Sequence, residues 1–436
     1  MNVPKLRFSE FEREWKTIKI QNIYEIKNGL NKGKEFFGHG ILILNYMDVN
    51  KNVFNDNKTI KGLVDLNEDE IERYSVNHND LFFTRTSETS DEIGLTSSYI
   101  GKKIRCVFSG FLLRARPLKN NVNSLFYAYY FRSPENRQKI IKHSSITTRA
   151  LISGSNLSQI NVHLPDLGEQ EKIASFLSKI DKKIEKLEKK EQLWQTYKNG
   201  MMQQLFSQKL RFKDENGSEY PDWKEKKLNN ISKLTSSKRV YLADYTKNGI
   251  PFYRGKEISN LRKGETIEDL LYISKSKYNE FKEKFDVPKK NDILITAVGT
   301  LGNVYRVVDD EPFYFKDGNL IWLKKIKENP YFLEYALEYN KKAILSSSIG
   351  STQKALTIVE LNKVKIKIPS LQEQTKIAYF ISSIDKKIKN IKKELKINIK
   401  FKKGLLQQLF PSDKKSIDIE IKNFSEHNQT EHKALL

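Results

Sequence analysis

The chain has 436 residues, about three times the ~150 residues of a typical domain, and 38% of them are hydrophobic, which excludes a wholly disordered chain and predicts more than one core. Lysine and arginine number 77 against 54 aspartates and glutamates, and the net charge of +23 favours an anionic partner, either nucleic acid or an acidic membrane surface. The chain has a single cysteine, which predicts that it has no disulfide framework and favours the cytoplasm. No apolar run approaches the ~20 residues of a membrane span, and the charged start has no signal-peptide core. We therefore expect a cytoplasmic protein with no membrane association.

The first block of the chain, residues 1–164, has the pattern of a mixed α/β domain. Short runs of β-forming residues at 40–44 and 80–84 are bounded by Asn, Asp and Gly, which are typical of turns. An aromatic run at 125–131 is compatible with a helix. We therefore predict strands at the first two positions and a helix at the third.

Residues 165–207 predict one long helix. Pro165 precedes the pair Glu169-Gln170, and both proline and an acidic residue suit a helix start. Alternate steps of four and three residues from Ile173 reach ten positions, of which eight are apolar. A period of 3.5 over this length predicts a coiled-coil seam, and about 38 helical residues would extend roughly 57 Å. The predicted seam begins with Ile173, Leu177, Ile180, Ile184 and Leu187, and its two polar positions are Glu191 and Lys198.

The second part of the chain repeats this order. Residues 208–368 predict a second mixed α/β domain, with a strand at 291–296 and an aromatic helix at 331–339. Residues 369–410 predict a second long helix, and 411–436 predict a mobile polar tail. The same count along the second helix again gives eight apolar positions of ten, beginning with Ile377, Ile381, Ile384, Ile388 and Ile391.

An internal duplication underlies this order. PDLGEQEKIASFLSKIDKKI at 165–184 recurs as PSLQEQTKIAYFISSIDKKI at 369–388, and the same offset relates GMMQQLF at 200–206 to GLLQQLF at 404–410. The helical segments are similar, whereas the blocks before them match only at scattered points. We predict an α/β (α+β) fold in which two mixed α/β domains, related by pseudo-two-fold symmetry, are separated by two long helices that form an antiparallel coiled coil. The alternative is two unrelated surface helices, each packed on its own domain.

No pattern of catalytic residues is convincing. Pro165-Asp166 followed by Asp181-Lys182-Lys183 matches the metal-binding pattern of many nucleases, but the second copy has Ser370 in place of the first carboxylate. Asp181 also lies inside the predicted heptad helix. The six histidines have no spacing suited to a metal, and one cysteine makes a structural zinc site improbable. We expect no catalytic residue and no metal site.

The repeated helix motifs P-x-L-x-E-Q-x-K-I-A and G-x-x-Q-Q-L-F, each closing a divergent block, resemble the specificity subunit of type I restriction–modification systems. The resemblance covers about residues 5–410. It implies that 1–164 and 208–368 are target-recognition domains that each read one half of a split, asymmetric sequence in double-stranded DNA. It also implies that this chain binds no cofactor itself. Modification subunits would carry S-adenosylmethionine and methylate adenine, and restriction subunits would use ATP and Mg.

The predicted DNA contacts follow from this resemblance and from the distribution of charge. Residues 101–164 carry 11 basic residues and 1 acidic residue, and 208–368 carry 31 and 22. In the first domain the predicted contacts are Arg85, Thr86, Ser87, Lys102, Arg105 and Arg149, and in the second they are Arg254, Lys256, Thr300, Gln353 and Lys354.

Two other classes of function remain open. One is a coiled-coil scaffold that binds nucleic acid nonspecifically, and the other is a stand-alone nuclease that uses the carboxylates described above.

Overall fold

The computed structural model describes residues 3–146, 148–350 and 354–411. Its contacts form two compact units: the first joins the chain up to Leu187 with the chain from Glu394 onward, and the second is Glu188–Lys393. The two predicted long helices are α6 (Leu167–Phe206) and α13 (Leu371–Gln408), and each contributes one segment to each unit. Within the described residues, no helix is long and apolar enough to cross a bilayer.

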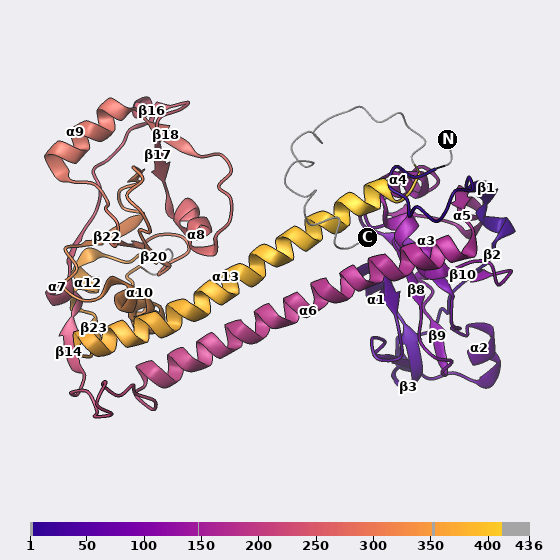
Figure 1. Ribbon diagram of the computed structural model, residues 1–436, viewed down its shortest axis with the longest axis horizontal. Coiled ribbons are helices and arrows are strands. Elements are labelled where there is room, and N and C mark those ends of the chain that lie inside the picture. The colour runs from indigo at the N-terminus through magenta and orange to yellow at the C-terminus, as the bar shows by residue number, and fades with distance from the viewer. Residues whose placement is uncertain (1–2, 147, 351–353, 412–436) are drawn as a thin grey trace. The chain divides into compact units, whose positions relative to one another are not determined.

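The first unit contains a central sheet and a smaller one. The central sheet has the strand order β2-β10-β6-β8-β4, and the smaller sheet has the order β5-β3-β9 (Figure 1). The strands are β1 (Lys16–Lys19), β2 (Tyr24–Asn28), β3 (Phe37–Leu44), β4 (Phe54–Asn55), β5 (Gly62–Val64), β6 (Leu81–Thr84), β7 (Thr86–Ser87), β8 (Thr96–Tyr99), β9 (Cys106–Phe108), β10 (Leu112–Pro117), β11 (Ser145–Ile146), β12 (Ala150–Leu151) and β13 (Asn161–Leu164). The helices are α1 (Tyr46–Lys51), α2 (Glu68–Arg73), α3 (Ser124–Arg132), α4 (Pro134–Lys142) and α5 (Gly154–Ser158).

The second unit repeats this central arrangement. Its four-stranded sheet has the order β15-β22-β19-β20, which matches β2-β10-β6-β8 strand for strand, and a second sheet has the order β16-β18-β17-β21. The strands are β14 (Lys224–Lys227), β15 (Lys233–Thr235), β16 (Tyr245–Thr246), β17 (Ile250–Tyr253), β18 (Leu271–Ile273), β19 (Ile293–Thr296), β20 (Val304–Arg306), β21 (Tyr314–Phe315), β22 (Leu320–Lys324) and β23 (Lys365–Ile368). The helices are α7 (Leu228–Ile231), α8 (Gly255–Lys263), α9 (Lys275–Phe285), α10 (Pro330–Tyr339), α11 (Lys341–Ser346) and α12 (Ile358–Lys363).

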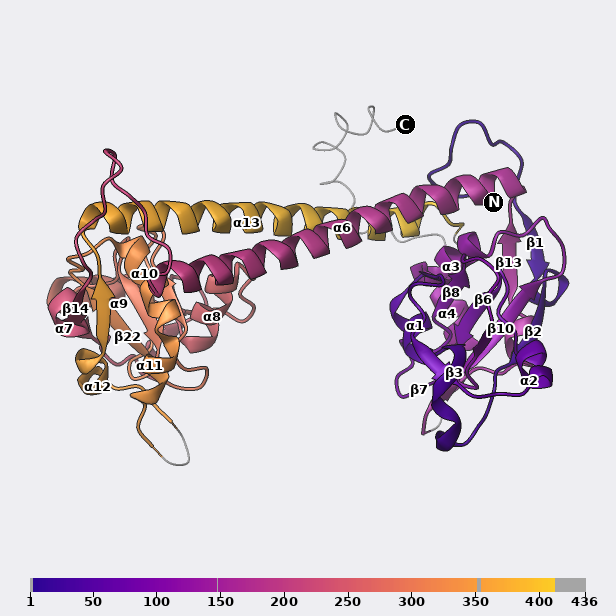
Figure 2. The same ribbon diagram turned by 90° about the horizontal axis from the view of Figure 1, so that it is seen from below.

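The central strands and the aromatic helices confirm the local sequence predictions. β6 and β19 are buried along their whole length, as expected for apolar runs in the middle of a sheet. α3 and α10 are the predicted aromatic helices, and Figure 2 shows α3 beside β8 and β6. Before each strand an asparagine, Asn79 or Asn291, adopts a left-handed conformation with φ of 69° or 74°. Asparagine tolerates this conformation better than most residues do, so it suits the turn into the strand.

A buried glutamate joins each domain to the start of its long helix. Glu169 is 1% exposed, and both of its carboxylate oxygens accept hydrogen bonds from Arg7, at 2.8 Å each. The indole Nε1 of Trp15 donates a third bond at 3.0 Å. The second unit repeats the arrangement with Glu373, Arg211 and Trp223. The glutamate is therefore a structural anchor, in addition to lying in the first helical turn as the sequence predicted.

The neighbouring glutamine makes a second anchor. The side chain of Gln170 accepts a hydrogen bond from the Asn123 amide at 2.8 Å and donates one to the Pro165 carbonyl at 2.9 Å. It thereby connects the approach to α3 with the start of α6. Gln374 does the same for α10 and α13, through Asn329 and Pro369.

The far end of each long helix packs into the domain that the other helix follows. In the first unit, Phe410 contacts the rings of Phe126 and Tyr130, with centroids 5.5 and 5.6 Å apart. In the second unit, Phe206 stacks on Tyr339 at 5.1 Å. The repeated QQLF motif therefore ends each helix with an aromatic residue that enters a domain core.

In each unit, contacts among a tyrosine, an aspartate and a lysine join the two long helices. In the first unit, Asp181 of α6 accepts a hydrogen bond from Tyr129 at 2.8 Å and pairs with Lys402 of α13 at 2.5 Å. Burial and the adjoining Asp181 carboxylate raise the pKa of Tyr129, so its hydroxyl remains a donor. The second unit has the same triad, made by Tyr335, Asp385 and Lys198.

The helices run antiparallel within each unit. In the second unit, Glu191 pairs with Lys392, and further along α6 Lys198 pairs with Asp385, so residue numbers rise on one helix as they fall on the other. The predicted seam residues are buried or half-buried. Ile173 and Leu177 lie in the core of the first unit, and Ile377 and Ile381 lie in that of the second. The polar positions Glu191 and Lys198 form ion pairs between the helices.

Replacing Glu169 with alanine tests the anchor. Arg7 and Trp15 would lose a shared buried acceptor, and breaking such a buried pair costs about 3 kcal/mol or more. We expect E169A to lower the thermal unfolding midpoint clearly, whereas Glu171→Ala, at an exposed position two residues away, should change stability by less than about 0.5 kcal/mol. Equal midpoints for the two variants would contradict the anchoring role.

Each long helix begins in one unit and ends in the other, and the two helices carry the same motifs. We therefore predict that a fragment of residues 1–207 forms a homodimer. Lys198 of each copy would meet Tyr129 and Asp181 of the other, because Lys198 and Lys402 occupy equivalent repeat positions. Each apolar seam residue removed from water contributes roughly 1.5–3 kcal/mol. Analytical ultracentrifugation should show a dimer, weakened by Lys198→Glu but not by Lys189→Glu on the exposed face. A fragment that stays monomeric at micromolar concentrations would refute this interpretation.

Candidate nucleic-acid interface

The loop that follows β6 is closed by a buried threonine. The hydroxyl of Thr84 donates a hydrogen bond to the Glu92 carbonyl at 2.7 Å and accepts one from the Leu95 amide at 2.9 Å. The Gly94 amide completes the closure by donating to the Thr84 carbonyl at 2.8 Å. Residues 85–93 therefore project from a fixed base at the end of the central strand.

The second unit closes a shorter loop in the same way. The hydroxyl of Thr296 donates to the Thr300 carbonyl and accepts from the Asn303 amide at 2.9 Å. The Gly302 amide donates to the Thr296 carbonyl at 2.8 Å. The two domains thus carry loops of different length and sequence on one kind of hydrogen-bonded base.

A second segment lies beside each loop. In the first unit, the Ile152 amide donates to the Arg85 carbonyl at 3.0 Å, and β12 pairs with β7. In the second unit, the Leu356 amide donates to the Ala297 carbonyl at 2.9 Å. Segments about 60 residues apart in sequence therefore meet at the end of the central strand in both units.

The first unit brings together four of the six residues that we predicted to contact DNA. Arg85 follows β6, Thr86 and Ser87 form β7, and Arg149 immediately precedes β12. Ser87 is only 5% exposed, and its hydroxyl accepts a hydrogen bond from Thr89, so its side chain faces inward. Arg149 is exposed and lies 3.7 Å from Glu88.

The two other residues, Lys102 and Arg105, lie elsewhere. They follow β8, which runs antiparallel to β6, so they are at the opposite end of the sheet from Arg85. Arg105 also pairs with the exposed carboxylate of Glu68. The basic stretch that suggested Lys102 and Arg105 therefore does not share a surface with Arg85.

In the second unit, the described residues that we predicted to contact DNA lie around the end of β19. Arg254 and Lys256 begin α8, and a side chain at the intervening Gly255 would contact Thr296 at 3.8 Å. Thr300 is in the loop after β19, and Lys354 precedes the segment that bonds to Ala297. Gln353 and residues 412–436 of the predicted tail lie outside the described residues.

Arg254 differs from a free cationic side chain. Its guanidinium Nη2 lies 2.5 Å from the buried carboxylate of Glu257, and this ion pair raises the pKa of Arg254. Much of its charge is therefore balanced inside the domain. Lys256 is exposed, and no ion pair is recorded for it among the described residues.

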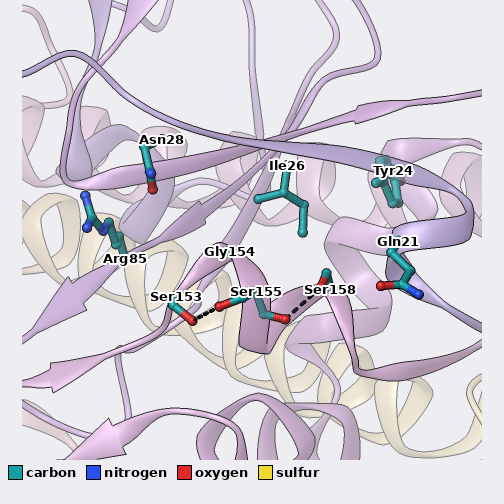
Figure 3. A pocket seen from close by; sticks show the side chains of 9 residues that line it. All are labelled: Gln21, Tyr24, Ile26, Asn28, Arg85, Ser153, Gly154, Ser155 and Ser158. Atoms are coloured by element: carbon teal, nitrogen blue, oxygen red, sulfur yellow. Dashed lines mark hydrogen bonds between the residues drawn. The ribbon is translucent and has the colours of Figure 1, made fainter.

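A cavity of about 490 Å³ opens beside Arg85 in the first unit. Figure 3 shows Arg85 and Asn28 at one end, Gln21 and Tyr24 at the other, and the serines of α5 along a further wall. Sequence reasoning identified Arg85 from its place after a strand. It missed Asn28 and Ser155, because the cavity is assembled from three separate segments and no local pattern marks them.

The two carboxylates of the nuclease pattern, Asp166 and Asp181, lie far apart and contact different partners. Asp166 immediately precedes α6, is 62% exposed and lies 3.6 Å from Arg13. Asp181 lies 15 residues further along, about 22 Å by the rise of an α-helix, and is held by Tyr129 and Lys402. In the described part of the chain, no group of three or more His, Cys, Asp or Glu residues could hold a metal ion.

The fold is duplicated, and each copy carries a loop of its own length and sequence on a common hydrogen-bonded base. The chain belongs to the family described as "Type I restriction modification DNA specificity domain", whose profile matches residues 12–195 and again residues 220–400.

Relatives of known class match over much of the chain. The type I restriction enzyme MjaVIII specificity subunit of Methanocaldococcus jannaschii is 27% identical over 355 residues, which cover 77% of this chain and 79% of the relative. The EcoBI specificity subunit of Escherichia coli is 25% identical over 295 residues, 60% of each chain. The crystal structure of a type I restriction-modification S subunit from M. genitalium has a TM-score of 0.58 at 19% identity, covering 94% of this chain and all of that one. This last similarity supports the fold.

Replacing Thr296 with valine tests the closed loop. Valine keeps the shape but removes the hydroxyl, which leaves the Asn303 amide without its acceptor at a cost of about 1–3 kcal/mol. Thr300→Val, at an exposed position of the same loop, should change stability by less than about 0.5 kcal/mol. Urea unfolding measures both, and hydrogen exchange at Asn303 should accelerate only in T296V. Unchanged exchange there would show that the hydroxyl does not hold the loop.

Proposed function

We propose that this protein is the DNA-specificity subunit of a type I restriction–modification complex, and that its two domains read the two halves of a split, asymmetric target in double-stranded DNA. The observation that carries this proposal is that the loops after β6 and β19 differ while the hydrogen bonds that close them are the same. A binding site that must distinguish two sequences needs variable contacts on an invariant support.

The distribution of charge supports DNA as the partner. Lys256 and Lys354 are exposed beside the loop after β19, and Arg149 is exposed beside the loop after β6. Cationic side chains at such positions release counterions when they meet phosphates, which gives affinity, while neighbouring polar groups can read base edges. A scaffold that binds nucleic acid nonspecifically would not need two different loops on one support.

We infer that catalysis is supplied by partners. Asp181, the carboxylate that a nuclease would need, is used by Tyr129 and Lys402 to pair the long helices. Modification subunits would bring S-adenosylmethionine for adenine methylation, and restriction subunits would bring ATP-dependent cleavage with Mg. A DNA substrate and the single, buried Cys106 favour the reducing cytoplasm as the location.

The long helices offer surfaces for such partners. Leu193 is 61% exposed on α6, and its repeat equivalent Ile397 is 56% exposed on α13. Tyr197, one turn beyond Leu193, is 46% exposed. Apolar side chains at matching positions of the two helices fit two copies of one modification subunit, each docking in the same way.

The proposal predicts activity only in the assembled complex. The purified chain should neither cut nor methylate DNA, and addition of modification subunits should produce adenine methylation at one bipartite sequence. Methylome sequencing of a host with and without the gene measures this. Metal-dependent cleavage by the chain alone, lost in Asp181→Ala, would instead support the nuclease alternative. Binding without any sequence consensus would support the scaffold.

A further inference from the structure

Arg85 is an arginine without an internal partner. Its Nε is buried, and no hydrogen bond or ion pair to its guanidinium is recorded within the described residues. Other arginines of the unit have internal partners: Arg116 makes two hydrogen bonds with the buried Asp80. Arg114 also has a buried Nε without a partner, but its Nη1 donates to the Ser75 carbonyl at 2.7 Å. Buried polar groups in proteins are nearly always satisfied, so an exception calls for an explanation.

The backbone holds Arg85 in place on both sides. Its amide donates to the Phe111 carbonyl at 2.8 Å, and its carbonyl accepts from Ile152 at 3.0 Å. The side chain therefore leaves a fixed point in the sheet, and Arg85 is one of the residues that line the cavity (Figure 3). A contact that must be accurate to a fraction of an ångström benefits from such a rigid base.

The cavity has the chemistry of a site for hydrogen-bond acceptors. None of the described residues that line it is acidic, and Arg85 supplies its positive charge. Asn28 offers both a donor and an acceptor, and Ser153 and Ser155 offer hydroxyls. Gly154 leaves the space open, because a Cβ there would come within 3.2 Å of Ile26.

The comparison of the two repeats favours a base contact over a phosphate contact. Ala297 occupies the position of Arg85 in the second unit, with the same hydrogen bond from the adjoining segment. Ile358 and Val359 replace Gly154 and Ser155 at the repeat offset. Phosphates are the same at every step of DNA, so a phosphate contact has no reason to differ between the two domains, whereas a base contact must differ when the two half-targets differ.

We propose that Arg85 reads a guanine in the half-target of the first domain, by donating two hydrogen bonds to O6 and N7 in the major groove, with Asn28 beside it at the rim of the cavity. This inference rests on the proposed DNA-specificity function, and it names one base of the target and the residue that recognises it. The planar guanidinium fits this pair of acceptors, and the pairing is the commonest specific contact between proteins and DNA. The Nη donors of Arg85 would then find both of their acceptors only on the correct sequence.

The test is selection of bound duplexes from a random-sequence pool by the full-length chain assembled with its modification subunits. Wild type should enrich a bipartite consensus that includes a guanine in one half. Arg85→Ala should lose discrimination at that one position, by roughly 5- to 150-fold, and keep the others. Arg85→Lys keeps the charge but lacks the planar fork, so it should weaken the same preference less than Arg85→Ala does, while the salt dependence stays as in wild type.

Matched variants separate the outcomes. Lys58→Ala removes an equally positive, exposed residue of the same unit and should leave the consensus intact. A uniform loss of affinity in R85A, with the consensus kept and the salt slope lowered by about one, would overturn the proposal in favour of a phosphate contact. An unchanged consensus accompanied by a lower unfolding midpoint would overturn it in favour of a structural role. Failure of wild type to enrich any consensus would refute the specificity function itself.

Discussion

The structure depends on the burial of one carboxylate at the start of each long helix. Glu169 and Glu373 are almost completely removed from water, and such a charge is stable only when its acceptor sites are filled. Arg7 and Arg211 fill them from the first residues of each domain, so the end of the domain must come back to its beginning where the helix starts. This single requirement fixes how each domain meets its helix.

A second constraint follows from the way in which the helices are shared. Each unit takes the beginning of one long helix and the end of the other, so every helix must satisfy two sets of contacts. In the first unit the Leu6 amide donates to the Gln408 carbonyl, and in the second the Leu210 amide donates to the Gln204 carbonyl, although only the second pair is close in sequence. The start motif of a long helix makes the same contacts in both units, and so does the end motif. The two copies of each motif are therefore alike in sequence.

The sequence predicted what is periodic or repeated, and missed what depends on distant partners. The long helices, the strands β6 and β19 and the aromatic helices follow from local patterns of apolar residues. The roles of Glu169 and Gln170 as anchors did not, because Arg7 is 162 residues away from the glutamate it binds. Similarly, Lys102 was predicted from a basic stretch and Arg85 from its place after a strand, whereas antiparallel pairing of β6 with β8 places the two residues at opposite ends of the sheet.

The division between constant and variable parts explains how one duplicated fold can serve two different sequences. Thr84 and Thr296 use both hydrogen-bonding capacities of a hydroxyl to close the loops, so the closure does not depend on the side chains inside the loops. The replacement of Arg85 by Ala297 therefore disturbs no hydrogen bond of the support. The hydrogen bonds of the helix anchors and of the loop bases recur in both units, whereas side chains such as Arg85 and Ala297 differ between them.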